Sequence, residues 1–105
     1  MGSSYKVNLT EPAENDLRDI ARYIAFQLKE PTIALKMVQT IRDALSNLET
    51  NALAHPLARD ERLAHAGYRP LVIKKYIAFY IADEKKKTVD VDRILYGRRD
   101  WKSIL

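Results

Sequence analysis

The second half of the chain repeatedly places Arg and Lys beside Tyr, and these residues have the clearest capacity for chemistry. The set comprises Arg69, Lys74, Lys75, Tyr76, Tyr80, Arg93, Tyr96, Arg98, Arg99 and Lys102. Guanidinium groups grip phosphates and aromatic rings stack on bases, so this mixture is typical of a nucleic-acid surface. Arg and Tyr can also cleave RNA without a metal, by holding the scissile phosphate and moving a proton. In the simplest alternative, the basic side chains only keep a β-hairpin soluble and the Tyr rings only pack on the sheet.

Other chemistries are poorly represented. The chain has no Cys, which removes thiol nucleophiles, disulfides and thiolate metal sites and fits a cytoplasmic protein. His55 and His65 lack the spacing of a metal pair, and Asp90 and Asp92 are more typical of a solvated strand edge than of an acid–base pair. Phosphate-binding glycine loops, nucleophile motifs and membrane-length apolar runs are absent. We therefore expect no metal, no small-molecule cofactor and no membrane partner.

The positive charge is concentrated in the second half of the chain. Residues 54–105 carry 12 Lys and Arg against 7 Asp and Glu, a net charge of +5, whereas the whole chain has a net charge of +4. An uneven basic surface favours a polyanion or an acidic protein segment as partner.

Hydrophobic periodicity predicts the elements that must position these side chains. An alternating segment at 5–9 indicates a strand, and apolar residues at helical spacing indicate a helix over 11–29, capped by Thr10 and ending before Pro31. A second helix, capped by Thr32, continues the helical spacing as far as Leu48, and the short link between the two requires an antiparallel hairpin. Residues 50–67 predict a loop with one short helical turn. The remaining strands are expected at 68–73, 75–82 and 88–96, the last two joined by a turn at 83–87.

This β-α-α-β-β-β order predicts an α+β fold in which the helix hairpin covers one face of a mostly antiparallel, twisted sheet. We expect a single domain over residues 5–105, after a start at residues 1–4 that reads as an expression remnant. In the strand at 75–82, alternation predicts that Ile77, Phe79 and Ile81 face the core, while Tyr76, Ala78 and Tyr80 face the open side. Arg93 interrupts an apolar row in the last strand. Either a β-bulge shifts the register there, or Arg93 reaches solvent at the sheet edge.

Three segments together resemble the RelE/ParE superfamily of toxins from bacterial type II toxin–antitoxin systems. They are "VNLTEPAENDLRDIARYI" near the start, "GYRPLVIKKYIAFYIAD" in the middle and "VDRILYGRRDW" near the end. The resemblance covers nearly the whole chain. It implies a helix hairpin on a twisted sheet, in agreement with the order above, and a cognate antitoxin as partner.

The superfamily divides by mechanism, and the residues here favour its ParE branch. RelE-type members, the ribonuclease branch, carry an Arg at the position of Ile77. They also usually carry a Tyr near the C-terminus, whereas this chain has no Tyr after Tyr96. The ParE branch is similar in its Tyr-x-x-x-Tyr strand and "GRRD" ending, and its members bind DNA gyrase without catalysis. The implied target-binding residues are Arg98, Arg99, Trp101, Lys102, Tyr76 and Tyr80.

Two alternatives stay open. A ribosome-dependent mRNA endoribonuclease would use a shifted set without a metal, namely Arg69, Lys74, Arg93, Arg99 and Tyr96. An inactive relative would only bind its antitoxin. For the tail itself, Trp101 either serves as an interaction anchor or folds back onto the domain.

Overall fold

The structure, a computed structural model, describes residues 4–105. Its elements are β1 (Lys6–Leu9), α1 (Glu11–Arg22), η1 (Tyr23–Gln27), α2 (Pro31–Ser46), α3 (Leu48–Asn51), α4 (Glu61–His65), β2 (Tyr68–Ile73), β3 (Tyr76–Asp83), β4 (Thr88–Tyr96) and α5 (Trp101–Ile104). Of the residues expected to be an added start, 1–3 lie outside the described part of the chain. No helix in the described part is long and apolar enough to cross a membrane.

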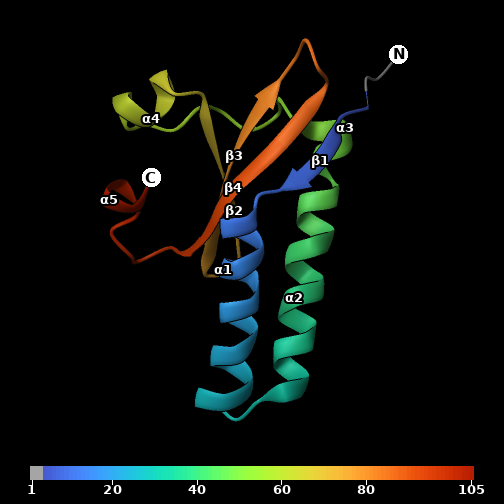
Figure 1. Ribbon diagram of the computed structural model, residues 1–105, viewed down its shortest axis with the longest axis vertical. Helices are drawn as coiled ribbons and strands as arrows, with labels where there is room; N and C mark the ends of the chain where they lie inside the picture. The colour runs from blue at the N-terminus through green and yellow to red at the C-terminus, as the bar shows by residue number, and fades with distance from the viewer. Residues whose placement is uncertain (1–3) are drawn as a thin grey trace.

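The strands form one sheet in the order β1-β4-β3-β2, with β1 parallel to β4 and the other neighbours antiparallel. The helices α1 and α2 run side by side as a hairpin and extend beyond the sheet at one end of the elongated molecule (Figure 1). This arrangement confirms the expected α+β fold. The main core lies between the hairpin and the sheet, where the fully buried side chains include Leu17, Ile41, Ala78, Tyr80 and Val91.

The first helix starts as its sequence requires. Thr10 is the N-cap, and its hydroxyl accepts a hydrogen bond from the Ala13 backbone at 3.2 Å. The helix widens into the π-helical turn η1, where the Leu28 amide bonds to the Tyr23 carbonyl. Lys29 then adopts a left-handed conformation with φ 56°, which ends the helix close to the predicted position.

The second helix begins two residues earlier than expected. Its N-cap is Glu30, whose side chain makes no capping bond, and Thr32 lies inside the first turn. Pro31 occupies the first helical position, where its missing N–H costs nothing and its fixed φ favours the helix.

The predicted orientation of β3 is wrong. Ala78 and Tyr80 are completely buried against the hairpin, and the Tyr80 hydroxyl donates a 2.7 Å hydrogen bond to the Ala52 carbonyl. Phe79, expected in the main core, is also buried but on the opposite face. Because both faces are covered at this strand, side-chain size does not distinguish them. The small Ala78 suits the close approach of the helices.

Of the two alternatives left open for Arg93, the structure has the β-bulge in β4. Phe79 pairs with Arg93 but Tyr80 pairs with Val91, so Asp92 is the extra residue in β4. The bulge moves Arg93 to the face of Phe79 and returns Ile94 to the hairpin side, where it is buried.

The face opposite the hairpin carries a second, smaller layer made by α4 and α5 (Figure 1). Asp60 caps α4 by accepting the Leu63 amide at 3.1 Å, and the Leu63 side chain is buried outside the main core. A guanidinium N–H of Arg62 donates to the Lys102 carbonyl, which ties α4 to α5. The short turn predicted within 50–67 is therefore α4, and α5 is an element that the sequence did not indicate.

Candidate functional site

Two neighbouring turns bring together four exposed cations at one end of the sheet. The Gly97 amide donates a 2.8 Å hydrogen bond to the Lys75 carbonyl, which fixes the segment after β4 against the turn between β2 and β3. We call the resulting surface the basic end; its residues are Lys74, Lys75, Arg98 and Arg99. All four are exposed, and none forms an ion pair or a side-chain hydrogen bond with any residue in 4–105. The structure therefore groups Arg98 and Arg99 with Lys74.

The backbone at these turns is unusual in ways that hold them together. A Cβ on Gly97 would lie 3.2 Å from the Lys75 carbonyl oxygen, a tighter contact than most Cβ atoms make, so the close approach favours glycine. Lys74 has φ 56°, the left-handed conformation that a two-residue hairpin turn of this kind demands. The close approach thus fixes the separation of the two turns that carry the cations.

Trp101 packs back onto the sheet. Its ring lies 5.2 Å from that of Phe79, centroid to centroid, on the face opposite the hairpin. Lys102 Nζ sits 5.6 Å from the Trp101 ring centre and 3.6 Å from the Asp60 carboxylate. The pKa of Asp60 is lowered, first by the hydrogen bond from the Leu63 amide and also by the charge of Lys102. Trp101 and Lys102 therefore anchor the tail, while Arg98 and Arg99 remain free.

Arg93 is committed to an internal ion pair. Its Nε and Nη2 donate to the two carboxylate oxygens of Asp16 at 2.7 and 2.8 Å, and these hydrogen bonds raise the pKa of Arg93. Asp16 also accepts the Ile94 amide at 2.9 Å. Because β1 ends at Leu9, no strand covers this part of the edge of β4, and Asp16 takes over part of that role. Arg93 thus serves the fold.

The other members of the possible ribonuclease set lie apart. Arg69 shares the hairpin side of the sheet with Tyr80, and its guanidinium donates to the His55 carbonyl at 2.6 Å. Arg93 lies on the opposite face, while Tyr96 meets Tyr76 edge to face at 6.0 Å near the basic end. The five residues therefore do not surround one phosphate-sized site.

Of the two tyrosines implied as target-binding, Tyr80 offers no surface and Tyr76 is only partly exposed; Tyr96 belongs to the ribonuclease alternative. Tyr80 has no exposed area, and burial raises its pKa to about 12, so it belongs to the core. Tyr76 is half-buried, and burial also raises its pKa, while Tyr96 is 38% exposed. The sequence-based orientation of β3 misplaced Tyr80 for the reason given above.

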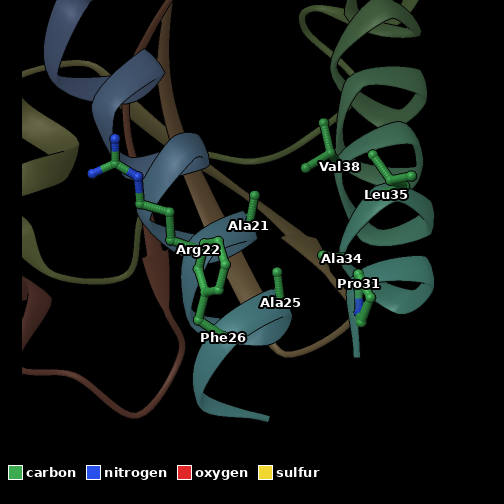
Figure 2. Close-up of a pocket in the computed structure, with 8 residues that line it drawn as sticks. All are labelled: Ala21, Arg22, Ala25, Phe26, Pro31, Ala34, Leu35 and Val38. Carbon is green, nitrogen blue, oxygen red and sulfur yellow. The ribbon is translucent and has the colours of Figure 1, made fainter. Parts of the chain in front are cut away.

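An apolar groove runs between α1, η1 and α2, as Figure 2 shows. Its volume is about 310 Å³, and its lining residues are Ala21, Arg22, Ala25, Phe26, Pro31, Ala34, Leu35 and Val38. Phe26 and Leu35 are 75% and 74% exposed, which is unusual for large apolar side chains. The sequence does carry a signal for this groove, since Phe26 and Leu35 fall off the buried stripe of their helices.

The described residues hold no cluster of three or more His, Asp or Glu side chains placed to bind a metal ion. One further polar pair lies at the bulge, where the Tyr68 hydroxyl donates to Asp92 at 2.6 Å. Burial and this hydrogen bond raise the pKa of Tyr68 to about 12.

Comparison with known proteins agrees with this architecture. Among solved structures, the chain is similar to one from a chromosomal ParDE toxin–antitoxin system of P. aeruginosa, with 24% identity and a TM-score of 0.73 over 89% of this chain and 96% of that one. It is also similar to a chain of the RelBE2 toxin–antitoxin complex of Mycobacterium tuberculosis, with 21% identity and a TM-score of 0.62 over 89% of this chain and 98% of that one. No curated protein matches the chain.

Both structural neighbours share the fold of helix hairpin and sheet described above. The sequence profile described as the ParE toxin of the type II toxin–antitoxin system parDE matches residues 7–101, which include every strand of the sheet but the first residue of β1. The chain therefore belongs to the family of ParE toxins of type II toxin–antitoxin systems.

Proposed function

We propose that this toxin inhibits growth by binding DNA gyrase through its tail, without catalysing a reaction itself. The observation that carries the proposal is the state of Arg98 and Arg99, which are exposed and free of internal partners while Gly97 and Trp101 fix the segment on either side. The backbone on either side of the two Arg residues is already held in place, so binding must order their side chains but not the segment that carries them. Membership of the ParE family supports gyrase as the target.

The dispersal of the ribonuclease residues argues against RNA cleavage. Arg69 and Arg93 point from opposite faces of the sheet, and each already binds an internal acceptor. Ile77 stands where the ribonuclease branch carries an Arg, and its side chain instead lies near Gly97. An aliphatic group there cannot hold a phosphate.

Neutralisation by an antitoxin is the second part of the proposal. The groove between α1, η1 and α2 presents Phe26 and Leu35 to solvent, and exposed cations at Arg22, Lys29 and Lys36 surround this end of the hairpin. An amphipathic antitoxin helix with an apolar face and acidic flanks would complement such a surface. Both structural neighbours come from toxin–antitoxin systems.

Supercoiling by purified gyrase tests the proposed target. The wild-type protein should inhibit the reaction, and Arg98→Gln with Arg99→Gln should raise the half-inhibitory concentration by about tenfold or more, equivalent to at least about 1.4 kcal/mol. The matched control is Lys85→Gln with Lys86→Gln, which removes the same charge from the exposed turn at the other end of β3 and should leave inhibition unchanged.

Full inhibition by the Arg98/Arg99 variant would remove the site assignment. If wild-type protein leaves gyrase active but promotes mRNA cleavage in translating ribosomes, the ribosome replaces gyrase as the target. If it does neither and yet binds its antitoxin tightly, the protein is an inactive relative.

A further inference from the structure

The basic end has a property that gyrase binding does not require: it is a compact surface of positive charge. Lys74 and Lys75 sit on one turn, Arg98 and Arg99 on the next, and all four side chains are exposed. The neighbouring acid, Asp100, forms no ion pair with them within the described residues. We propose that the basic end binds the phosphate backbone of duplex DNA, an activity that goes beyond the proposed function and does not depend on it.

The two pairs of cations are held side by side before any ligand arrives. The Gly97–Lys75 hydrogen bond of 2.8 Å joins the turns, and the left-handed Lys74 fixes the direction in which its turn projects. The contact between Trp101 and Phe79 fixes the chain just beyond Arg99. The backbone positions that carry the four cations are therefore already set when they meet a repeating array of phosphates.

Phosphate fits this surface better than an acidic protein or single-stranded bases. Arg is common at protein hot spots, so Arg98 and Arg99 also suit a protein target, but Lys is depleted there, and Trp101 is already packed against Phe79 with Lys102 over its ring. The two lysines that complete the basic end therefore favour phosphate. Base stacking needs open aromatic faces, but Tyr76 is half-buried and packs with Tyr96. The surface then consists mainly of long basic side chains. Such side chains contact the phosphate backbone of DNA without a preference for base sequence.

The opposite end of the sheet shows that Lys content alone does not make such a surface. Lys85, Lys86 and Lys87 also crowd one turn, but Asp83 and Glu84 share it. The Asp83 carboxylate accepts the amides of Lys85 and Lys86 at 3.0 Å each, so a carboxylate sits within that turn. This turn is the natural control for the basic end.

Salt-dependent binding of the purified toxin to a short fluorescent DNA duplex tests the proposal without gyrase. Four phosphate contacts predict a slope of about −3.6 in log affinity against log salt, or a loss of about 150-fold between about 50 and 200 mM NaCl. Lys74→Asn with Lys75→Gln should reduce the slope to about −1.8 and the loss to about 12-fold. Asn is chosen because it tolerates the left-handed backbone of position 74.

The control variant Lys85→Gln with Lys86→Gln should keep the wild-type slope, although it loses the same charge. If the salt slope falls equally in both variants, the effect depends only on net charge and the proposal is overturned. An absence of binding at the lower salt concentration, tighter binding of single-stranded RNA than of the duplex, or equally effective competition by polyglutamate would also overturn it. Because gyrase is absent, these failures leave the proposed target untouched, and a negative supercoiling assay leaves the DNA result untouched.

Discussion

At the scale of single residues, Asp16 shows how one carboxylate can complete a sheet. It is the one charged residue among the buried side chains of the described chain, and it binds both the Arg93 guanidinium and the Ile94 amide. Thr10 works beside it, since its amide donates to the Val91 carbonyl at 3.0 Å and its hydroxyl to the Asp92 carbonyl at 2.9 Å. The edge of β4 that β1 leaves uncovered is therefore closed by the start of α1.

Replacing Asp16 should consequently destabilise the fold. Asp16→Ala leaves the Ile94 amide and the partly buried Arg93 without their acceptor, which should lower the free energy of unfolding by about 2–3 kcal/mol. Asp19→Ala removes an exposed carboxylate from the same helix and should change it by no more than about 0.5 kcal/mol. Urea unfolding of both variants measures the difference, and equal stabilities would contradict the role given to Asp16.

The sequence indicates the buried role of Asp16 through its position on the helix rather than through its charge. Asp16 falls between Ala13, Leu17 and Ile20 on the apolar stripe of α1, so a carboxylate there must be buried and must have a partner. An acid is also favoured near the start of a helix, but that preference does not depend on which face of the helix the residue occupies. Arg93 interrupting an apolar row was the matching signal on β4.

At the scale of elements, periodicity predicted where helices and strands lie but not which face of β3 meets the hairpin. The strands at 68–73 and 88–96 have the predicted bounds, and β3 differs from its prediction by one residue at each end. The orientation failed because alternation shows that two faces exist, not which of two covered faces lies under the helices. The layer of α4 and α5 that buries Phe79 depends on contacts between distant segments, such as Trp101 with Phe79, which local pattern cannot show.

Truncating a side chain should change the free energy of unfolding by very different amounts on the two faces of α2. Ile41 is fully buried, so Ile41→Ala should lower the free energy of unfolding by about 2–5 kcal/mol through the cavity it leaves. Leu35 is 74% exposed, so Leu35→Ala should cost no more than about 0.5 kcal/mol while weakening antitoxin capture. Thermal unfolding and antitoxin titration of both variants check this, and a large stability loss at Leu35 would show that the groove is closed in solution.

At the scale of the whole molecule, the buried phenol of Tyr80 and the half-buried phenol of Tyr68 make stability depend on alkaline pH. Burial raises the pKa values of Tyr68 and Tyr80 to about 12, above the ordinary value of 10.0 that they regain on unfolding. As the pH rises past 10, the unfolded chain loses these protons before the folded one does. Their contribution is therefore complete below about pH 10 and is lost as the pH rises towards about 12.

Urea unfolding at increasing pH measures this dependence. The free energy of unfolding should fall across that window in wild type, and the fall should be shallower in Tyr68→Phe with Tyr80→Phe, although these changes also remove two internal hydrogen bonds. Exposed lysines contribute alike to both proteins, so the comparison isolates the phenols. An unchanged slope would show that the two hydroxyls reach water in the folded state.

The glycine at the joint between the two turns has a consequence for how such a toxin can vary. A Cβ at position 97 would lie 3.2 Å from the Lys75 carbonyl oxygen, so a larger residue there requires the two turns to shift by a few tenths of an ångström. A neutral substitution there would redistribute the cations in space while leaving their number unchanged. The arrangement of the positive charges at the basic end therefore depends on one uncharged position, whereas their number depends on the four charged residues.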